Sequence, residues 1–106
     1  MPFAEMAAES MPDNPSIQDT LGTVYIRLGQ TEKADRSLSR ALSLAGSADE
    51  AVAPLLHMAE LRLAKGAKEE AGTYLRRAEE LIRNQPALAG IYAELLKDLK
   101  AKRDVK

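Results

Sequence analysis

The sequence predicts an all-α fold in which antiparallel helix-turn-helix units stack into a solenoid. Ala, Leu, Glu, Lys and Arg dominate the 106 residues, whereas aromatic residues make up only 4% of the chain, a composition that favours helix. Two stretches also repeat each other at a spacing of 37 residues, because Gly29, Ala34, Leu38 and Ala41 recur as Gly66, Ala71, Leu75 and Ala78. Similarity at a fixed period is typical of arrays in which each unit buries its apolar face against the next. A chain of this length is expected to form a single domain.

Two helices are predicted in the first of these stretches. The first helix follows Asn14-Pro15 and ends near Gly29, because apolar residues recur there every three or four positions. The second helix carries an apolar stripe of the same period. Thr31 is placed to cap its start, and Gly46 is placed to terminate it.

Three further helices are predicted in the rest of the chain. Ser47-Ala-Asp-Glu50 has the pattern of a capping box, which marks the start of the third helix. Pro54 lies inside this helix, so the helix either kinks at the proline or begins there, and we favour the early start with a kink. Apolar stripes over 71–82 and 88–99 predict the fourth and fifth helices. Everything past Lys100 is polar and is expected to fray.

Small residues within the first two helices predict close packing between them. A glycine inside a helix costs about 1 kcal/mol relative to alanine, so Gly22 indicates that another backbone passes nearby, with Ala34 as the expected neighbour. Ala41 would likewise let the next helix approach, while Leu38 and Leu42 fill the space beside it.

The net charge of −1 conceals an asymmetry along the chain. Residues 1–60 hold nine acids and four bases, a balance of −5, whereas residues 61–106 hold seven acids and eleven bases, a balance of +4. Ends of opposite sign favour head-to-tail stacking. Tyr74 and Tyr92 in the basic half occupy apolar helical positions and not a stacking surface, so nucleic-acid binding is not expected.

Composition also bears on compartment and membrane association. The absence of cysteine excludes disulfides and thiolate chemistry but leaves the compartment open between cytoplasm and periplasm. No apolar run approaches the roughly 18 residues of a membrane helix, and the first dozen residues are acidic. The sequence therefore predicts no membrane insertion and no signal peptide within these 106 residues, and removal of a signal is the open alternative.

Residues 15–48 resemble a repeat of the tetratricopeptide family. The resemblance rests on Leu-Gly, then Tyr three residues on, then Gly, Ala, a large apolar residue and Ala at the family's offsets, here Leu21, Gly22, Tyr25, Gly29, Ala34, Leu38 and Ala41. The second unit is looser. It has Met58-Ala59 in place of Leu-Gly and Arg62 in place of the tyrosine, but it keeps Gly66, Ala71, Leu75 and Ala78.

The resemblance implies about two repeats, preceded by a half-repeat helix and followed by a capping helix. Counting back from Pro15 puts Pro12 at the family's proline position and Ala7 at an alanine position, with Phe3-Ala4 before it. We therefore expect the C-terminal piece of a longer bacterial array. Its expected parts are the end of a preceding repeat at 3–12, repeat 1 at 15–48, repeat 2 at 49–85 and the capping helix at 86–102.

The resemblance further implies a concave groove lined by the first helix of each unit. The matching positions here are Ser16, Asp19, Thr23, Ile26 and Arg27, then Ala53, Leu56, Glu60, Leu63 and Ala64. Ile26, Leu56 and Leu63 would form an apolar strip that suits an amphipathic helix or an extended apolar peptide. Coverage of this strip by the fifth helix or by a second chain is the alternative. The lysines and asparagines with which the family's chaperone-binding branch clamps a carboxylate are missing at the matching positions, which disfavours that branch.

No pattern in the chain predicts catalysis, a cofactor or a metal site. His57 is the sole histidine, and Glu60 beside it does not complete a ligand set, so His57 is expected on the exposed side of its helix. No nucleophile-elbow or phosphate-loop motif is present.

The sequence therefore predicts a non-enzymatic scaffold that binds a protein or peptide in the groove. The alternative function is a capping and self-association module of a larger repeat protein. Arrays generally need about three units for stability, and an open N-terminal side favours a homodimer through residues 3–9 and the first helix.

Overall fold

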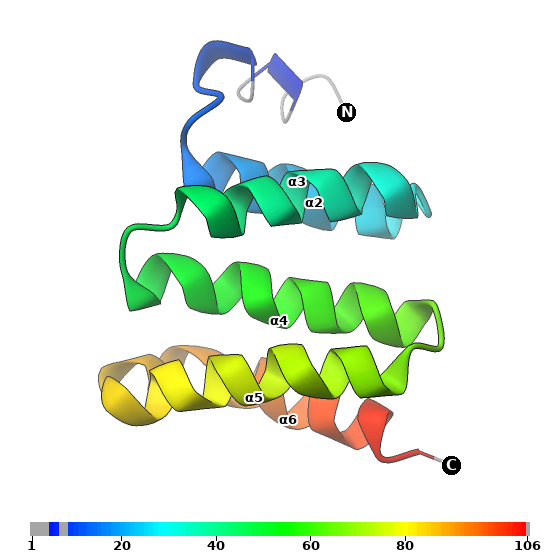
Figure 1. Cartoon of the computed structure of the whole chain (residues 1–106), viewed down its shortest axis with the longest axis vertical. Helices are drawn as coiled ribbons and strands as arrows, with labels where there is room; N and C mark the ends of the chain where they lie inside the picture. The colour runs from blue at the N-terminus through cyan, green and yellow to red at the C-terminus, as the bar shows by residue number, and fades with distance from the viewer. Residues whose placement is uncertain (1–4, 7–8, 106) are drawn as a thin grey trace.

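The computed structural model describes residues 5–6 and 9–105, and this part of the chain is helical without a strand (Figure 1). The predicted all-α helical repeat is confirmed. Helices follow one another through short loops, which places sequence neighbours side by side. They are α2 (Pro15–Arg27), α3 (Thr31–Leu44), α4 (Ala48–Ala64), α5 (Lys68–Asn84) and α6 (Ala87–Arg103).

The helices form two hairpins and a single closing helix. In the first hairpin α2 packs against α3, and in the second α4 packs against α5. Helix α4 also contacts both α2 and α3, and α6 contacts both α4 and α5 (Figure 1). Thus α6 has the same relation to the second hairpin as α4 has to the first, and α2, α4 and α6 form a continuous row.

The two glycines that share the 37-residue spacing make identical turns. Gly29 and Gly66 have φ angles of 76° and 78°, a left-handed conformation that glycine adopts without steric cost. The amide of the following residue donates to the carbonyl of Tyr25 in the first turn (2.9 Å) and of Arg62 in the second (2.8 Å). These are Schellman motifs, which satisfy carbonyls that the helix leaves unpaired and fix the entry of the next helix.

The core consists of two apolar clusters that meet in α4. One cluster joins α2 and α3 to Met58 and Leu61, and the other joins α5 and α6 to residues such as Leu55 and Leu56. The small and large residues repeated on the second helix of each unit are 0% exposed, namely Ala34, Leu38, Ala41, Ala71, Leu75 and Ala78.

Gly22 marks a close approach, as expected, but mainly to a side chain. A Cβ added there would lie 2.6 Å from both Cγ and Cδ2 of Leu38 and 3.6 Å from the Ala34 carbonyl oxygen. The fully buried leucine therefore occupies the space that any side chain at position 22 would need.

Two signals that were predicted at the ends of α3 act differently in the structure. Thr31 is the first residue of the helix, and the preceding Gln30 is the N-cap without a side-chain bond, so the prediction that Thr31 caps the helix is wrong. The helix ends at Leu44, and its C-cap residue Ala45 is extended (φ −63°, ψ 121°). Because the chain leaves the helix through this extended residue, Gly46 makes no left-handed cap.

The predicted early start of the third helix is confirmed, since α4 follows Ser47 and continues through Pro54. The capping box, however, does not form. Glu50 Oε1 accepts from the Gly46 amide at 2.9 Å, whereas the Ser47 hydroxyl donates to Asp49 at 2.7 Å and caps no backbone amide. The glutamate thus binds the amide of the residue before the N-cap and satisfies none of the orphan amides of the helix.

The chain end was expected to fray past Lys100, but α6 continues to Arg103. The Arg103 side chain packs near Gly72 of α5, where its Cδ would lie 3.7 Å from an added Cβ. Lys68 Nζ contacts the carbonyl oxygen of Val105. Contacts with α5 therefore hold the polar end of α6 in place.

The segment expected to end a preceding repeat is described only in part, because Phe3, Ala4 and Ala7 lie outside the described residues. Of the described ones, Glu5 accepts a hydrogen bond from the Tyr25 hydroxyl at 3.4 Å. The Pro12 carbonyl accepts from side chains of both α2 and α3, with distances of 3.1 Å and 3.0 Å. This segment therefore lies against the first hairpin.

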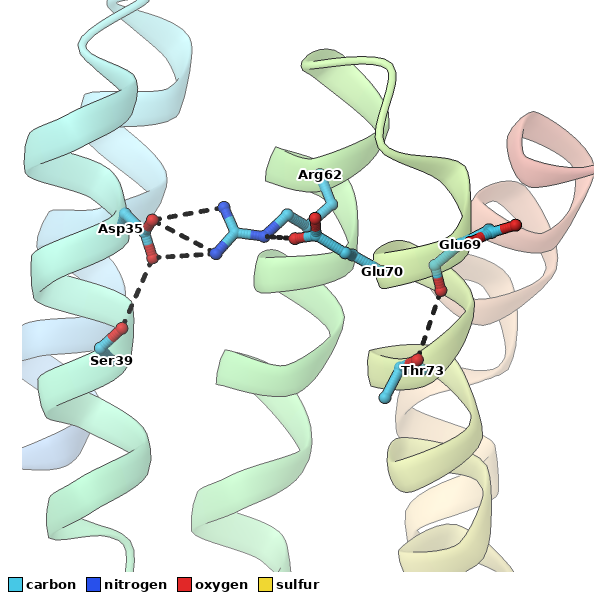
Figure 2. Close-up of polar contacts among 6 residues, drawn as sticks. All are labelled: Asp35, Ser39, Arg62, Glu69, Glu70 and Thr73. Carbon is cyan, nitrogen blue, oxygen red and sulfur yellow. Dashed lines mark hydrogen bonds and ion pairs between the residues drawn. The ribbon is translucent and has the colours of Figure 1, made fainter.

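Arg62, which stands where the family has tyrosine, links three helices (Figure 2). Its guanidinium donates to Asp35 of α3 at 3.2–3.3 Å and lies against the ring of Tyr74, 5.9 Å from its centre. Nε lies 3.0 Å from Glu70 of α5 but its N–H does not point at the carboxylate, so this contact is an ion pair only. Burial works to lower the Arg62 pKa, but Asp35 and Tyr74 together raise it above its ordinary value.

Candidate partner-binding face

The residues predicted to line a groove lie on α2 and α4, which are neighbours in the row of first helices. They differ in exposure, and the difference follows their position on each helix. Ser16, Arg27 and Ala64 are exposed, Asp19, Thr23, Ile26, Ala53, Glu60 and Leu63 are partly buried, and Leu56 is fully buried.

Leu56 does not belong to an exposed apolar strip, so this part of the prediction is wrong. Its side chain is 0% exposed and lies in the core cluster that contains Leu88 and Leu99 of α6. Residues of the fifth helix thus belong to the core cluster in which Leu56 is buried. Ile26 and Leu63 remain as partly buried apolar residues of the face.

A polar contact that was not predicted joins the two helices of this face. His57 Nδ1 lies 2.8 Å from Asp19 Oδ1, and the two side chains are only 19% and 14% exposed. The expectation of an exposed histidine is therefore wrong. The two residues are 38 apart, one period plus one position, which places them on facing sides of consecutive first helices. That offset is the sequence signal by which the pair could have been found.

Helix α6 extends the row and contributes Tyr92. Burial raises the pKa of this phenol above its ordinary value, and the negative charges of Asp19 and Asp49 raise it further. These carboxylates belong to α2 and α4, the two preceding helices of the row. The sequence pattern had identified Tyr92 only as an apolar position.

Titration of Tyr92 tests these influences on its pKa. In a Tyr25→Phe, Tyr74→Phe background, the pKa of the remaining phenol should lie above the ordinary value of 10.0 in the native protein and near that value in denaturant. The contribution of Tyr92 to stability is then complete below the unfolded pKa and is lost as pH rises through the folded pKa. Near-ultraviolet absorbance against pH measures both midpoints. Asp19→Asn should lower the native midpoint, and equal midpoints in both states would contradict the arrangement.

The face offers carboxylates, an imidazole and apolar side chains, and these do not assemble a metal site. Within the described residues, no three His, Asp or Glu side chains are close enough to hold a metal ion. None of the described helices combines the length and apolar character needed to cross a membrane. The arrangement suits recognition by contact, with apolar groups beside charges.

The fold and this face define a helical-repeat protein built from stacked hairpins. A family model described as tetratricopeptide repeat matches residues 16–47, a segment that spans nearly all of α2 and all of α3. This hairpin is therefore a tetratricopeptide repeat. Searches of curated proteins and of solved structures found no match. Repeats of this family generally mediate protein–protein interaction and are typically non-enzymatic.

Proposed function

We propose that the chain is a protein-interaction scaffold that binds a peptide or helix across α2 and α4. The observation that carries this proposal is the equivalent placement of Ile26 and Leu63, which are one period of 37 residues apart on neighbouring helices. Both side chains are partly buried, so each presents a limited apolar surface from a fixed position. A ligand with two apolar side chains at matching separation would contact both helices at once.

Charged groups around this pair give the ligand a preferred orientation. Arg27 follows Ile26 and is exposed, whereas Glu60 precedes Leu63 by one helical turn and is partly buried. Glu60 forms no ion pair within residues 5–6 and 9–105. Asp19, by contrast, is engaged with His57. We therefore expect the ligand to place a basic group near Glu60 and an acidic group near Arg27.

Selection of ligands followed by mapping tests the proposal. Peptides are selected from a random displayed library against the 106-residue chain, and the tightest is titrated into labelled protein while amide chemical shifts are recorded. We expect the changes to cluster on residues 19–27 of α2 and 57–64 of α4. Changes confined to the outer surfaces of α3 and α5 would contradict the proposal.

Leu63→Glu should weaken binding of the selected peptide by at least about tenfold, because it replaces an apolar contact by a charge. Ser43→Glu is the matched control, since it adds the same charge at an exposed position of α3. Its affinity should equal that of the unmodified chain. Equal weakening by both variants would show a general charge effect and would argue against the face.

A further inference from the structure

A second surface, separate from the α2–α4 face, lies between the end of α5 and α6. It is an apolar groove of about 340 Å³ whose lining residues come almost entirely from one side of α6. They are Ile82, Ala89, Ala93, Leu96, Lys97 and Lys100. We call it the α6 groove.

The repeat register shows what kind of element fits this groove. Without the three extra residues around Gly46–Asp49, repeat 2 runs over 52–85 and is 34 residues long, so Ala89 and Ala93 correspond to Leu55 and Ala59 of α4, which are 1% and 0% exposed in the core that α4 forms with α5. One unit earlier, Gly22 of α2 is covered by Leu38 of α3. The α6 groove is thus equivalent to the surface that the second helix of the unit covers in each of the two complete hairpins.

The two helices that fill the equivalent places have the same apolar stripe. It consists of an alanine, a leucine four residues on and an alanine three residues further, as in Ala71, Leu75 and Ala78. All three side chains are 0% exposed. An occupant of the α6 groove would therefore be a helix with small residues on either side of a larger apolar one.

The rim of the α6 groove adds a charge requirement. Lys97 and Lys100 stand 34 residues after Leu63 and Gly66. The rim is therefore basic at the positions where repeat 2 has an apolar residue and a glycine. Lys100 pairs with Glu79 of α5 at 2.7 Å, and Lys97 is exposed. An occupant with carboxylates along its flank would complement this rim.

The N-terminal side of the same chain meets the charge requirement and carries exposed apolar side chains, although Ala4 stands at the position of the stripe's leucine. Residues 1–26 contain four acids and no lysine or arginine. Glu5 and Glu9 are exposed, and Met6 and Met11 are large apolar residues with 60% and 52% exposure. In the sequence, Ala7 stands 34 residues before Ala41, at the alanine position of the stripe.

We propose that the α6 groove receives the N-terminal side of a second copy, so that chains associate head to tail. Helix α6 of one chain and the N-terminal side of the next would together complete a hairpin of the same kind as α4 and α5. The two contacting surfaces are different, so the contact is heterologous and can add further chains. Attraction between the acidic side and the lysine rim should make association weaken with salt.

Sedimentation velocity over a concentration series tests the proposal with the 106-residue chain. At low ionic strength we expect the average mass to rise continuously with concentration beyond that of two chains, and to fall when salt is added. Ala93→Glu, which places a bulky charge in the groove, should leave a monomer with unchanged helical circular dichroism. Ala101→Glu is the control, because Ala101 is exposed on the same helix but does not line the groove, and it should still associate.

A charge exchange identifies the partner surface. Lys97→Glu and Glu9→Lys should each weaken association by about tenfold or more, and the double variant should recover most of the loss because opposite charges meet again. Three results would overturn the proposal. They are a monomer at all concentrations in low salt, a closed dimer that Ala93→Glu leaves intact, and a double variant no better than the single ones.

Discussion

Leu56→Ala should lower the free energy of unfolding by about 2–5 kcal/mol, the range for deleting a large aliphatic side chain from a packed core. Leu56 is 0% exposed and lies in the cluster that joins α4 to α5 and α6. The substitution removes apolar contacts and leaves a cavity that the surrounding helices fill only in part. Chemical denaturation followed by circular dichroism measures the change.

Leu63→Ala is the matched control for this experiment. The two leucines lie on the same helix, and the family pattern assigns both to the groove, but Leu63 is only partly buried. Its loss should therefore cost clearly less than that of Leu56, about 1 kcal/mol or below. Similar costs for the two substitutions would show that α6 does not cover Leu56 as described.

Gly22→Ala should destabilise the protein although alanine is the better helix former. Alanine gains about 1 kcal/mol of helix propensity over glycine, whereas overpacking a filled core costs about 1–3 kcal/mol. An added Cβ would lie 2.6 Å from two carbon atoms of Leu38, which is itself 0% exposed and cannot swing into solvent. We expect a net loss of about 1 kcal/mol, measured as a shift of the denaturation midpoint.

Gly90→Ala separates packing from propensity. Gly90 also lies within a helix, but nothing stands within 4 Å of an added Cβ. This substitution should therefore stabilise the protein by about 0.5–1 kcal/mol. Combining Gly22→Ala with Leu38→Ala should cost less than the sum of the single changes, since the smaller side chain relieves the contact. Additive costs would show that the destabilisation by Gly22→Ala does not arise from contact with Leu38.

The sequence predicts those parts of the fold that depend on local chemistry and on repetition. Gly29 and Gly66 mark identical turns because a left-handed residue ends each helix, and the alanines and leucines of the stripe are buried because the helical period puts them on one side. Capping by Thr31 failed because a hydroxyl at a helix start is used only when the residue itself is the N-cap.

Features of the candidate face that depend on packing between distant helices were predicted only as an alternative, as for Leu56, or not at all. The burial of Leu56 depends on the position of α6, and the residue pattern of α4 alone does not reveal that position. The contact of Asp19 with His57 depends on how α2 and α4 are shifted relative to each other along their axes. Arg62 replaces the family's tyrosine, and only the structure shows that its guanidinium pairs with Asp35 of α3.

Helix α4 contacts each of the other four labelled helices, whereas neither hairpin partner, α3 or α5, contacts the other. Separation of either end of the row would therefore expose an apolar surface of α4, whose residues contribute to both core clusters. In a long array, unfolding can begin at one end and proceed unit by unit. Here the shared central helix couples the two ends, so the short row is expected to lose its structure as one cooperative unit.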